Sequence, residues 1–444
     1  MRSSLRRPLL VVGLSVVALA GWLGLSPLLA VAPSGSAVAA APSGSASGPS
    51  RSAATPSATG PSTTPTASAG PGTTGLPGQP PPPIPSMRRT LDAWLSRLRA
   101  RAGIPGVSAA IIFPDGSMWV GASGLADVAA KRQVGLDTAF AVASISKTFT
   151  AALILALVED GRIALDVPVV TYLPELVIDR GITVRQLLDH SSGLRDFFFH
   201  KNIDAALLKE PGRRWDAADA LRYVGRPYFK PGTGWHYSNT NYLVLGMLAE
   251  RVGGASVAVQ LRERFIDPLG LSDTYYQAVE QPHSPTSHGY RFSGAGRKWP
   301  PIDLSDGTRV VPFTSVVTAA GAAGSIATSA GDLARWARAL YGGTVLGPQM
   351  RVAMLAHVLR TTAYEPSTGY GLGVQVVTID GHATLGHSGR LLGFSAVMRW
   401  LPHEGVAIAV LTNQSRTDPD VVLRKLLRIG LQQPSDCSTC PIRR

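Results

Sequence analysis

The sequence predicts a mixed α+β fold, an α/β sandwich in which an antiparallel sheet is built from both ends of one domain. Runs of β-type residues come early in the domain and return late, while the stretch between them, residues 146–268, is mostly helical in its pattern. The strand-like runs are residues 107–113, 118–122, 371–378, 391–401 and 405–412. Because such runs must pair to bury their apolar side chains, we expect one sheet flanked by helices, with an inserted, mostly helical subdomain.

The elements at the two ends of the domain carry clear local signals. Residues 88–101 place Leu91, Trp94, Leu95 and Leu98 on one helical face. The first two strand-like runs are separated by Pro114-Asp115-Gly116, which is typical of a hairpin turn. A final helix is expected over residues 419–431. A cleft between the sheet and the helical insertion is a natural place for a small-molecule site.

The N-terminus predicts export from the cytoplasm. Arg2, Arg6 and Arg7 precede an apolar run, residues 9–32, that contains no charged residue. Positive residues before such a run keep its N-terminus in the cytoplasm and send the rest of the chain outward. The run is long enough to span a bilayer, but Ala37-Val38-Ala39 offers a plausible cleavage site. Residues 1–32 are therefore either a cleaved signal peptide or a retained anchor, the membrane being a partner only in the second case.

Composition divides the rest of the chain into three parts. Residues 33–86 are almost entirely Pro, Ser, Ala, Thr and Gly, with Arg51 as their only charge, which predicts a disordered linker. Residues 87–433 are the expected folded domain, and residues 434–444 form a C-terminal tail. The tail holds the two cysteines, Cys437 and Cys440, which we expect to form a local disulfide outside the cytoplasm; a redox pair is the alternative.

The charge balance does not indicate a nucleic-acid partner. The chain has 42 basic and 29 acidic residues, a net charge of +13, but no block of five or more basic residues and no interleaving with aromatic ones. Anionic polymers of the cell envelope would suit such a surface equally well. A metal or other cofactor is not expected either, because the pair His403-Glu404 has Ala407, not histidine, at the spacing of a zinc protease.

The candidate nucleophile is Ser144 in the segment Ser144-Ile145-Ser146-Lys147. This segment opens a buried helix, whose N-terminal N–H groups favour developing negative charge. Lys147 lies three residues on, on the same helical face, where burial would lower its pKa and let it take the serine proton. Of seven lysines, only Lys147 follows a serine at this spacing. No G-x-S-x-G motif is present, so the nucleophile elbow of α/β-hydrolases is excluded.

A second candidate motif is the glycine-rich loop that leads from Lys230 to Tyr237-Ser238-Asn239. A tyrosine beside a cation can act as general base and then return the proton to the leaving group. The amide of Asn239 can bridge Lys147 and a substrate carbonyl. The alternative is purely structural, since Ser238 or Asn239 could simply cap the helix that follows.

The third motif is His387-Ser388-Gly389-Arg390, just before the apolar run that starts at Leu391. Gly389 would let a substrate backbone lie close to a strand edge. The N–H of Arg390 and that of Ser144 could form an oxyanion hole. A turn before a strand is the alternative. A fourth segment, residues 187–194, contains His190, which we interpret as structural because His and Gly are ordinary at helix C-termini.

Taken together, these segments resemble the serine β-lactamase/D-alanyl-D-alanine carboxypeptidase family, in particular its branch related to class C β-lactamases. The resemblance covers about residues 87–431, and its motifs come in the family's order: Ser-Ile-Ser-Lys at 144–147, Leu-Leu-Asp-His-Ser-Ser-Gly-Leu at 187–194, Tyr-Ser-Asn at 237–239, Tyr-Gly-Leu-Gly at 370–373 and Gly-His-Ser-Gly at 386–389. Each motif is weak alone, but the ordered set is specific.

The resemblance implies a β-lactamase/transpeptidase-like fold and a catalytic route. Ser144 would be acylated, Lys147 and Tyr237 would share the proton transfers, and water would release the product. One departure bears on the substrate, because His387 stands where β-lactamases of this branch carry lysine. If the substrate has a carboxylate, Arg390 is the best remaining cation, with His387 as a weaker partner.

Three functions follow from this sequence. The first is a D-alanyl-D-alanine carboxypeptidase-like hydrolase that acts on peptidoglycan peptides outside the membrane. The second is an esterase or a weak β-lactamase on the same scaffold, with an ester or a β-lactam as substrate. The third is an inactive envelope-binding protein, against which the complete set of Ser144, Lys147 and Tyr237 argues.

Overall fold

The structure is a computed structural model that describes residues 85–431 except 293–298, 305–312, 362–367 and 416. The apolar run 9–32, the linker up to residue 84, and Cys437 and Cys440 lie outside the described residues, so the predictions made for them stay predictions. Within the described part, no single helix is long and apolar enough to cross a membrane. One bent pair, Asn239–Gly253 with Val257–Ile266, passes that test by length and composition only.

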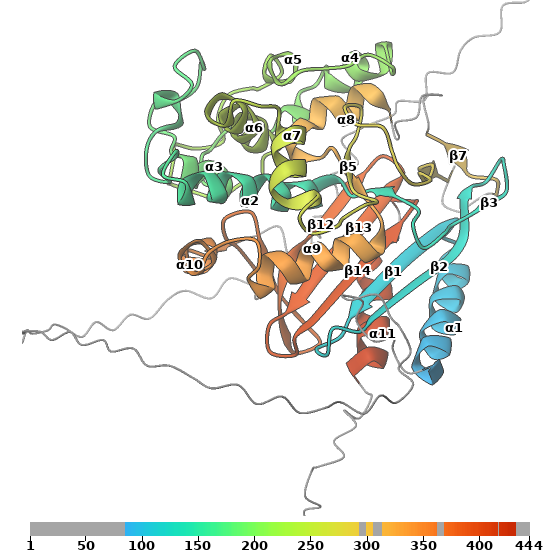
Figure 1. Cartoon of the computed structure of the whole chain (residues 1–444). Helices are drawn as coiled ribbons and strands as arrows, with labels where there is room; N and C mark the ends of the chain where they lie inside the picture. Colours follow the sequence, from blue (N-terminus) through green and yellow to red (C-terminus); the bar gives the residue numbers. More distant parts are fainter. Residues whose placement is uncertain (1–84, 293–298, 305–312, 362–367, 416, 432–444) are drawn as a thin grey trace, which may run out of the picture. The chain divides into compact units, whose positions relative to one another are not determined.

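The central sheet combines strands from both ends of the domain, as the sequence predicts (Figure 1). Its nine strands are antiparallel and run in the order β3-β2-β1-β14-β13-β12-β11-β10-β9. The N-terminal and C-terminal strands of the domain meet inside the sheet, where β1 pairs with β14. Val107 lies opposite Thr412, and Ile112 lies opposite Ala407. The strands are β1 Gly106–Ile112, β2 Met118–Asp127, β3 Arg132–Gln133, β9 Leu359–Arg360, β10 Gly369–Tyr370, β11 Gln375–Ile379, β12 His382–Leu391, β13 Phe394–Leu401 and β14 Val406–Thr412.

Helices and short strands between β3 and β9 form the inserted region (Figure 1). The helices of the described residues are α1 Pro85–Ala102, α2 Ser146–Glu159, α3 Val184–Leu188, α4 Ile203–Lys209, α5 Ala217–Leu221, α6 Asn239–Gly253, α7 Val257–Leu261, α8 Thr314–Ala320, α9 Ala330–Gly342, α10 Pro348–Ala356 and α11 Pro419–Leu431. The short strands are β4 Phe140–Ala141, β5 Tyr275–Tyr276 and β8 Ile326–Thr328 in one small sheet, and β6 Tyr290–Arg291 with β7 Ile302–Asp303 in another.

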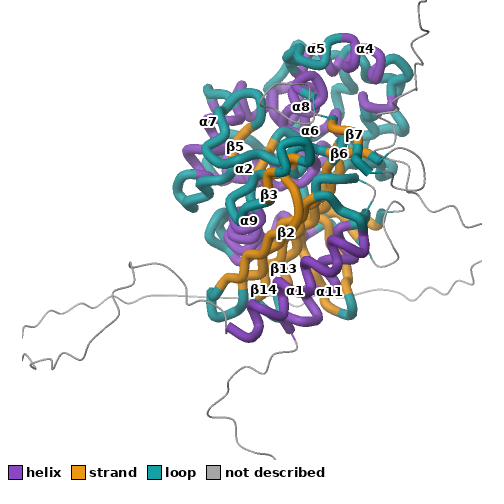
Figure 2. The backbone as a smooth tube through the Cα atoms, turned by 90° about the vertical axis from the view of Figure 1, so that its right-hand side faces the viewer, coloured by secondary structure: helices purple, strands orange, loops and turns teal. Residues whose placement is uncertain are grey.

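The two faces of the large sheet are covered by different helices. Alternate residues of β1 and β14, such as Ile111 and Ile408, pack against α1 and α11, which lie side by side (Figure 2). The residues between them, such as Ala110 and Ala409, lie on the face covered by α9 and belong to the core that also includes residues of α2 and α6. Because both faces are buried, these strands are almost entirely apolar, which is why the sequence pattern identifies them.

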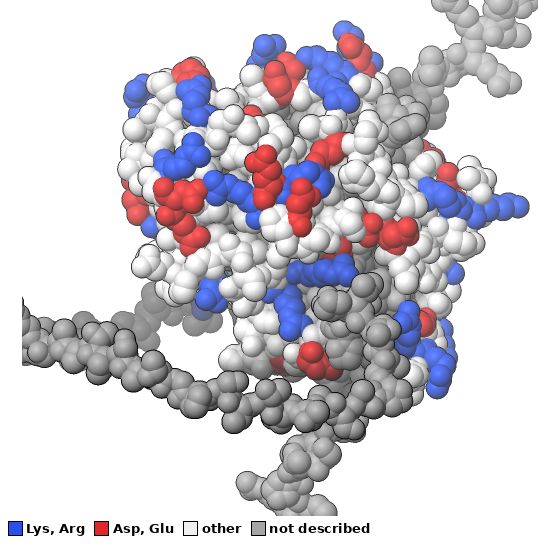
Figure 3. All heavy atoms as spheres, in the orientation of Figure 1, with Lys and Arg blue, Asp and Glu red and all other residues white. Residues whose placement is uncertain are grey.

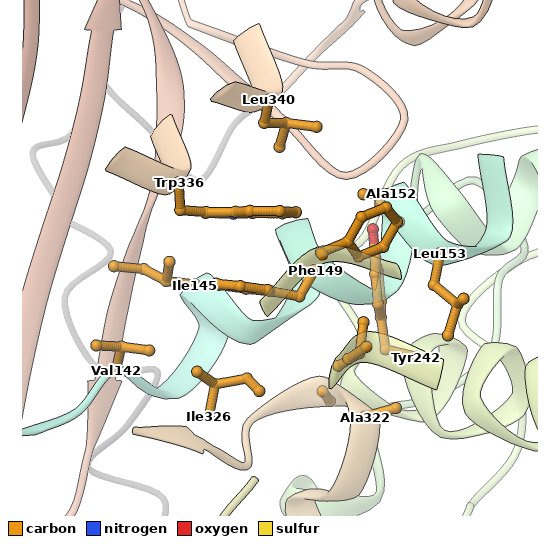
Figure 4. Packing of buried hydrophobic residues seen from close by; sticks show 14 of the residues in the cluster. Val142, Ile145, Phe149, Ala152, Leu153, Tyr242, Ala322, Ile326, Trp336 and Leu340 are labelled. Carbon is orange, nitrogen blue, oxygen red and sulfur yellow. The ribbon is translucent and has the colours of Figure 1, made fainter. Parts of the chain in front are cut away.

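Helix α2 runs through the centre of the larger core, as Figure 4 shows. All its residues from Ser146 to Leu157 are buried, so the helix is buried on every side and has no exposed polar face over this length. The ring of Phe149 stacks on that of Trp336 in α9, with centroids 4.0 Å apart and planes 7° from parallel. This packing fixes the helix that carries the candidate nucleophile segment at its N-terminus.

The predicted strands near the end of the chain need two corrections. The run 391–401 is not one strand, because β12 ends at Leu391 and β13 begins at Phe394 after a two-residue turn. Gly393 makes this turn with a φ of +80°, a conformation that favours glycine. The motif His387-Ser388-Gly389 therefore lies inside β12 and not in a turn before a strand. The run 371–378 also begins later, since β11 covers Gln375–Ile379.

Candidate active site

Ser144 lies where the small sheet gives way to α2. A 3₁₀ turn, Ala143–Ile145, connects β4 to the helix and leaves the Ser144 side chain half-buried. The preceding residue, Ala143, has a φ of +49°, a left-handed conformation that is costly for a residue with a Cβ. Such strain persists only where the surroundings hold it in place, and it is common at functional sites.

Lys147 contacts Ser144 from the first turn of α2. Its ammonium nitrogen lies 3.2 Å from the Ser144 hydroxyl oxygen, 2.7 Å from Oδ1 of Asn239 and 2.8 Å from the carbonyl oxygen of Ala323. An ammonium has three N–H groups, and these contacts use all three. The side chain is fully buried, and this desolvation lowers the pKa of Lys147 to about 7, although the charge of Asp196 acts in the opposite direction. A proton can therefore leave or return to this nitrogen near neutral pH.

Tyr237 reaches the same place from the loop before α6. Its half-buried ring has its centroid 4.9 Å from the Lys147 ammonium nitrogen. The same ring packs on His190, with centroids 4.3 Å apart, and its centroid lies 6.3 Å from that of the His387 ring. The three side chains predicted for proton transfer, Ser144, Lys147 and Tyr237, thus come together from segments up to 93 residues apart.

Asn239 is the first residue of α6 and faces Lys147, as predicted. Its carbonyl oxygen accepts the bond from the lysine, whereas its Nδ2 donates to Oδ2 of Asp196 at 2.7 Å. The backbone N–H of Asn239 donates to the same carboxylate oxygen at 3.1 Å. The alternative capping role is not what the structure shows, since Ser238 occupies the N-cap position without a capping side-chain bond.

His387 belongs to strand β12, and its ring faces that of Tyr237 across 6.3 Å. Its Nε2 lies 3.0 Å from the hydroxyl oxygen of Tyr370, and its Nδ1 lies 2.5 Å from the carbonyl oxygen of Ser388. Burial, together with the charge of Lys147, lowers the pKa of His387 to about 3. The imidazole is therefore neutral, and its surroundings do not support the expectation that it helps as a cation to bind a carboxylate.

Gly389 brings β12 against the nucleophile segment. A Cβ at this position would lie 2.0 Å from the carbonyl oxygen of Val142 and 3.1 Å from the backbone nitrogen of Ser144, so only glycine fits. The backbone N–H of Ser388 points along the sheet to Oε1 of Gln375, at 3.1 Å. Because backbone N–H groups alternate in direction along a strand, the N–H of Arg390 faces the same edge. The pairing of Arg390 and Ser144 N–H groups as an oxyanion hole is compatible with this placement.

The structure adds two residues that the sequence analysis missed or underrated. Asp196 is buried and bonded to Asn239, yet its only sequence signal is its position shortly after the segment 187–194. His190 does serve the structure, but within the site: its Nδ1 accepts the N–H of Ser238 at 3.2 Å, and its ring supports Tyr237. Burial keeps the pKa of His190 well below its usual value, so this ring is neutral as well.

Among the described residues, no group of three or more His, Cys, Asp and Glu side chains could hold a metal ion. The site is built from a hydroxyl, an ammonium, a phenol, a carboxamide and backbone N–H groups. These are the groups that acyl transfer through a serine ester needs.

Comparisons of the sequence and of the structure with known proteins point to the same group of hydrolases. The family model described as Beta-lactamase matches residues 91–432. Penicillin-binding protein 4 of Amycolatopsis lactamdurans is 30% identical over 339 residues, which cover 72% of this chain and 84% of that protein. Among solved structures, the D-amino acid amidase from Ochrobactrum anthropi SV3 superposes with a TM-score of 0.67 at 25% identity, covering 78% of this chain and 98% of that one. The D-stereospecific amidohydrolase from a Streptomyces species gives a TM-score of 0.64 at 29% identity, covering 80% of this chain and 99% of that one.

Proposed function

The chain belongs to the Beta-lactamase family and is a serine hydrolase of that family, and on this premise we propose that it works through an acyl-enzyme on Ser144, as a D-alanyl-D-alanine carboxypeptidase-like enzyme acting on peptidoglycan peptides. The observation that carries the proposal is the contact of 3.2 Å between a buried lysine and the Ser144 hydroxyl. A serine hydroxyl is a weak nucleophile until a neighbouring base takes its proton.

The proposed acylation begins when the neutral amine of Lys147, assisted by Tyr237, accepts the proton of the Ser144 hydroxyl. The oxygen attacks the substrate carbonyl carbon, and the negative charge that develops on the carbonyl oxygen is stabilised by the N–H groups of Ser144 and Arg390. When the carbon–nitrogen bond breaks, the leaving amine takes the proton back through Tyr237. An ester on Ser144 remains.

Deacylation repeats these steps with water in place of the serine hydroxyl. Water gives a proton to the same base and attacks the ester carbonyl. The bond to Ser144 breaks, its oxygen recovers a proton, and the product leaves as a free acid. The same groups serve both halves because the two reactions pass through similar tetrahedral intermediates.

The relatives support an amide bond next to a D-residue as the target. Their names are those of a penicillin-binding protein, a D-amino acid amidase and a D-stereospecific amidohydrolase. A terminal carboxylate would have to meet Arg390, whose side chain is half-exposed, because His387 is neutral. Export, expected from Arg2, Arg6, Arg7 and the apolar run 9–32, would place the enzyme where peptidoglycan lies.

The decisive experiment compares three substrate classes on one preparation: a D-Ala-D-Ala peptide, a small ester and a cephalosporin. We expect release of D-alanine, which Ser144→Ala abolishes. Rapid ester cleavage without D-alanine release would instead assign the chain to the esterases. Mass spectrometry after treatment with penicillin or a fluorophosphonate tests the remaining alternative, since absence of an adduct on Ser144 would favour an inactive binding protein.

A further inference from the structure

We propose that Asp196 is a positioning residue that holds the Asn239 amide in the orientation in which Asn239 accepts a hydrogen bond from Lys147, and so keeps the lysine on the Ser144 hydroxyl. The inference rests on the proposed function, because it concerns the same reaction. Asp196 does not touch Ser144, and its effect on the reaction would pass through Asn239.

Asp196 makes its contacts with two separate oxygens. Oδ1 accepts the backbone N–H of Phe198 at 3.0 Å and caps the short 3₁₀ turn Phe197–Phe199. Oδ2 accepts both the backbone N–H and the side-chain Nδ2 of Asn239. The carboxylate is 2% exposed, and these three donors satisfy it. One oxygen thus serves the local turn and the other serves the candidate active site, so the two roles can be separated by substitution.

The oxygen and the nitrogen of a carboxamide can exchange places by rotation at little cost, unless the neighbouring groups distinguish an acceptor from a donor. The two neighbours of the Asn239 carboxamide make this distinction. Toward Asn239, Lys147 donates in both of its protonation states, because a neutral amine still has two N–H groups while its lone pair faces the Ser144 hydroxyl. An ionised Asp196 can only accept. The reverse orientation of the amide would therefore place two donors face to face at Lys147 and two acceptors face to face at Asp196. In a buried site each such mismatch leaves polar groups unsatisfied. Asp196 therefore fixes the carbonyl oxygen of Asn239 toward Lys147 and leaves the second N–H of Nδ2 for a substrate carbonyl.

The charge of Asp196 adds a second effect on Lys147. Around the ammonium lie the rings of Tyr237 and Tyr242, and His190 and His387 are neutral, so among the described residues Asp196 is the anion that acts on this lysine. Burial raises the pKa of Asp196, whereas the hydrogen bonds from Asn239 and Phe198 and the charge of Lys147 lower it and favour the carboxylate. Its charge raises the pKa of Lys147 against the larger lowering by desolvation. Removing the charge should therefore lower the lysine pKa further.

Two substitutions separate these effects from the folding role. Asp196→Asn keeps the shape of the side chain but removes its negative charge. Because an amide can both donate and accept, residue 196 would then no longer fix which end of the Asn239 amide faces it. Asp196→Ser keeps an N-cap oxygen for Phe198 but is too short to hold the Asn239 side chain. We expect each to lower kcat roughly 10- to 100-fold through loss of alignment. For Asp196→Asn the acid limb of the profile of kcat/KM against pH should also move down by about 1 unit.

The matched control is Asp216→Asn, because Asp216 also caps a short helix, α5, through its carboxylate but is exposed and has no contact with Asn239 or Lys147. Its kcat and pH profile should equal those of the wild type. Melting temperatures of all variants identify any that do not fold.

A double-mutant cycle tests the route through Asn239. In an Asn239→Ala background, measured as the single-turnover acylation rate, Asp196→Ser should cost little more, because the two residues act as one unit. Additive losses would overturn the inference, as would wild-type kcat and pH profile in folded Asp196 variants. If the wild type itself shows no activity that depends on Ser144, the proposed function fails instead. Should neither Asp196 variant fold, an unchanged pH profile and kcat in Asn239→Ala would reject the inference.

Discussion

The buried ammonium of Lys147 is held between the Ser144 hydroxyl, 3.2 Å away, and the Asn239 carbonyl oxygen, 2.7 Å away. This relationship makes Lys147 sensitive to small changes, since a fully desolvated cation depends on every partner that remains. The following predictions test what each part of the site contributes.

Replacing Lys147 by methionine should slow acylation strongly without unfolding the domain. Methionine has a similar length and no charge to bury, whereas the lysine bears a desolvation cost. We expect the acylation rate to fall by about 10² to 10⁴, the range typical for loss of a general base. Burst kinetics with a chromogenic ester measure this rate. A burst of wild-type size in Lys147→Met would contradict the proposed role.

Activity should rise with pH through neutrality. The reactive form has a neutral Lys147, whose pKa is lowered to about 7 by burial, so kcat/KM should increase as this group loses its proton. His387 should add no second inflection near pH 6.5, because its pKa is about 3. A profile of kcat/KM between pH 5 and pH 9 checks both points. A second inflection near pH 6.5 that is lost in His387→Gln would contradict this prediction, because it would show that His387 titrates in this range.

Substituting Gly389 should damage the site by a steric effect. An added Cβ at 2.0 Å from the Val142 carbonyl oxygen would push β12 away from the nucleophile segment. Gly389→Ala should therefore lower kcat by about 10²-fold, the effect of a small misplacement. Gly331→Ala in α9 is the control, because its Cβ would meet only ordinary contacts at 3.5 Å or more. Equal kcat values for the two variants would disprove the close approach.

Arg390 should matter for some substrates only. Its side chain is the proposed partner of a substrate carboxylate, whereas its backbone N–H serves the oxyanion. Arg390→Ala should therefore raise KM for a D-Ala-D-Ala peptide by about tenfold, the cost of one charge-assisted bond, and leave a neutral ester unaffected. Equal effects on both substrates would remove Arg390 as a specificity residue.

The core around α2 should dominate stability. Phe149 is fully buried and stacks on Trp336, so Phe149→Ala removes a large ring from a closely packed region (Figure 4). The free energy of unfolding should fall by about 3–5 kcal/mol. Urea denaturation measures this change. The exposed residue Val352 is the comparison, where alanine should change stability by less than about 0.5 kcal/mol.

Charges of both signs are mixed on the face of the molecule that Figure 3 shows. Lys, Arg, Asp and Glu side chains are scattered and mixed over the face seen in Figure 3, with patches of both signs close together. The residues that matter for the chemistry are instead buried or half-buried, like Lys147 and Asp196. Net charge is therefore a poor guide to the function of this chain.

The sequence by itself determined the features that depend on neighbours along the chain. The spacing of Ser144 and Lys147 is sufficient because a 3₁₀ turn that continues into a helix brings residues three apart to the same side. The apolar strands at both ends of the domain are buried on both faces, and their composition predicts one sheet built from both ends of the domain. The order of the motifs carried the family resemblance.

Tertiary structure decided the contacts between distant segments. Asp196 and Asn239 are 43 residues apart, and no local pattern links a carboxylate to an amide whose orientation it fixes. His387 looks like a possible cation in the sequence, but its pKa depends on burial and on Lys147, which only the folded chain supplies. The small residues around Gly389 disfavour a strand by composition, and they lie in one because β12 must pass close to Ser144.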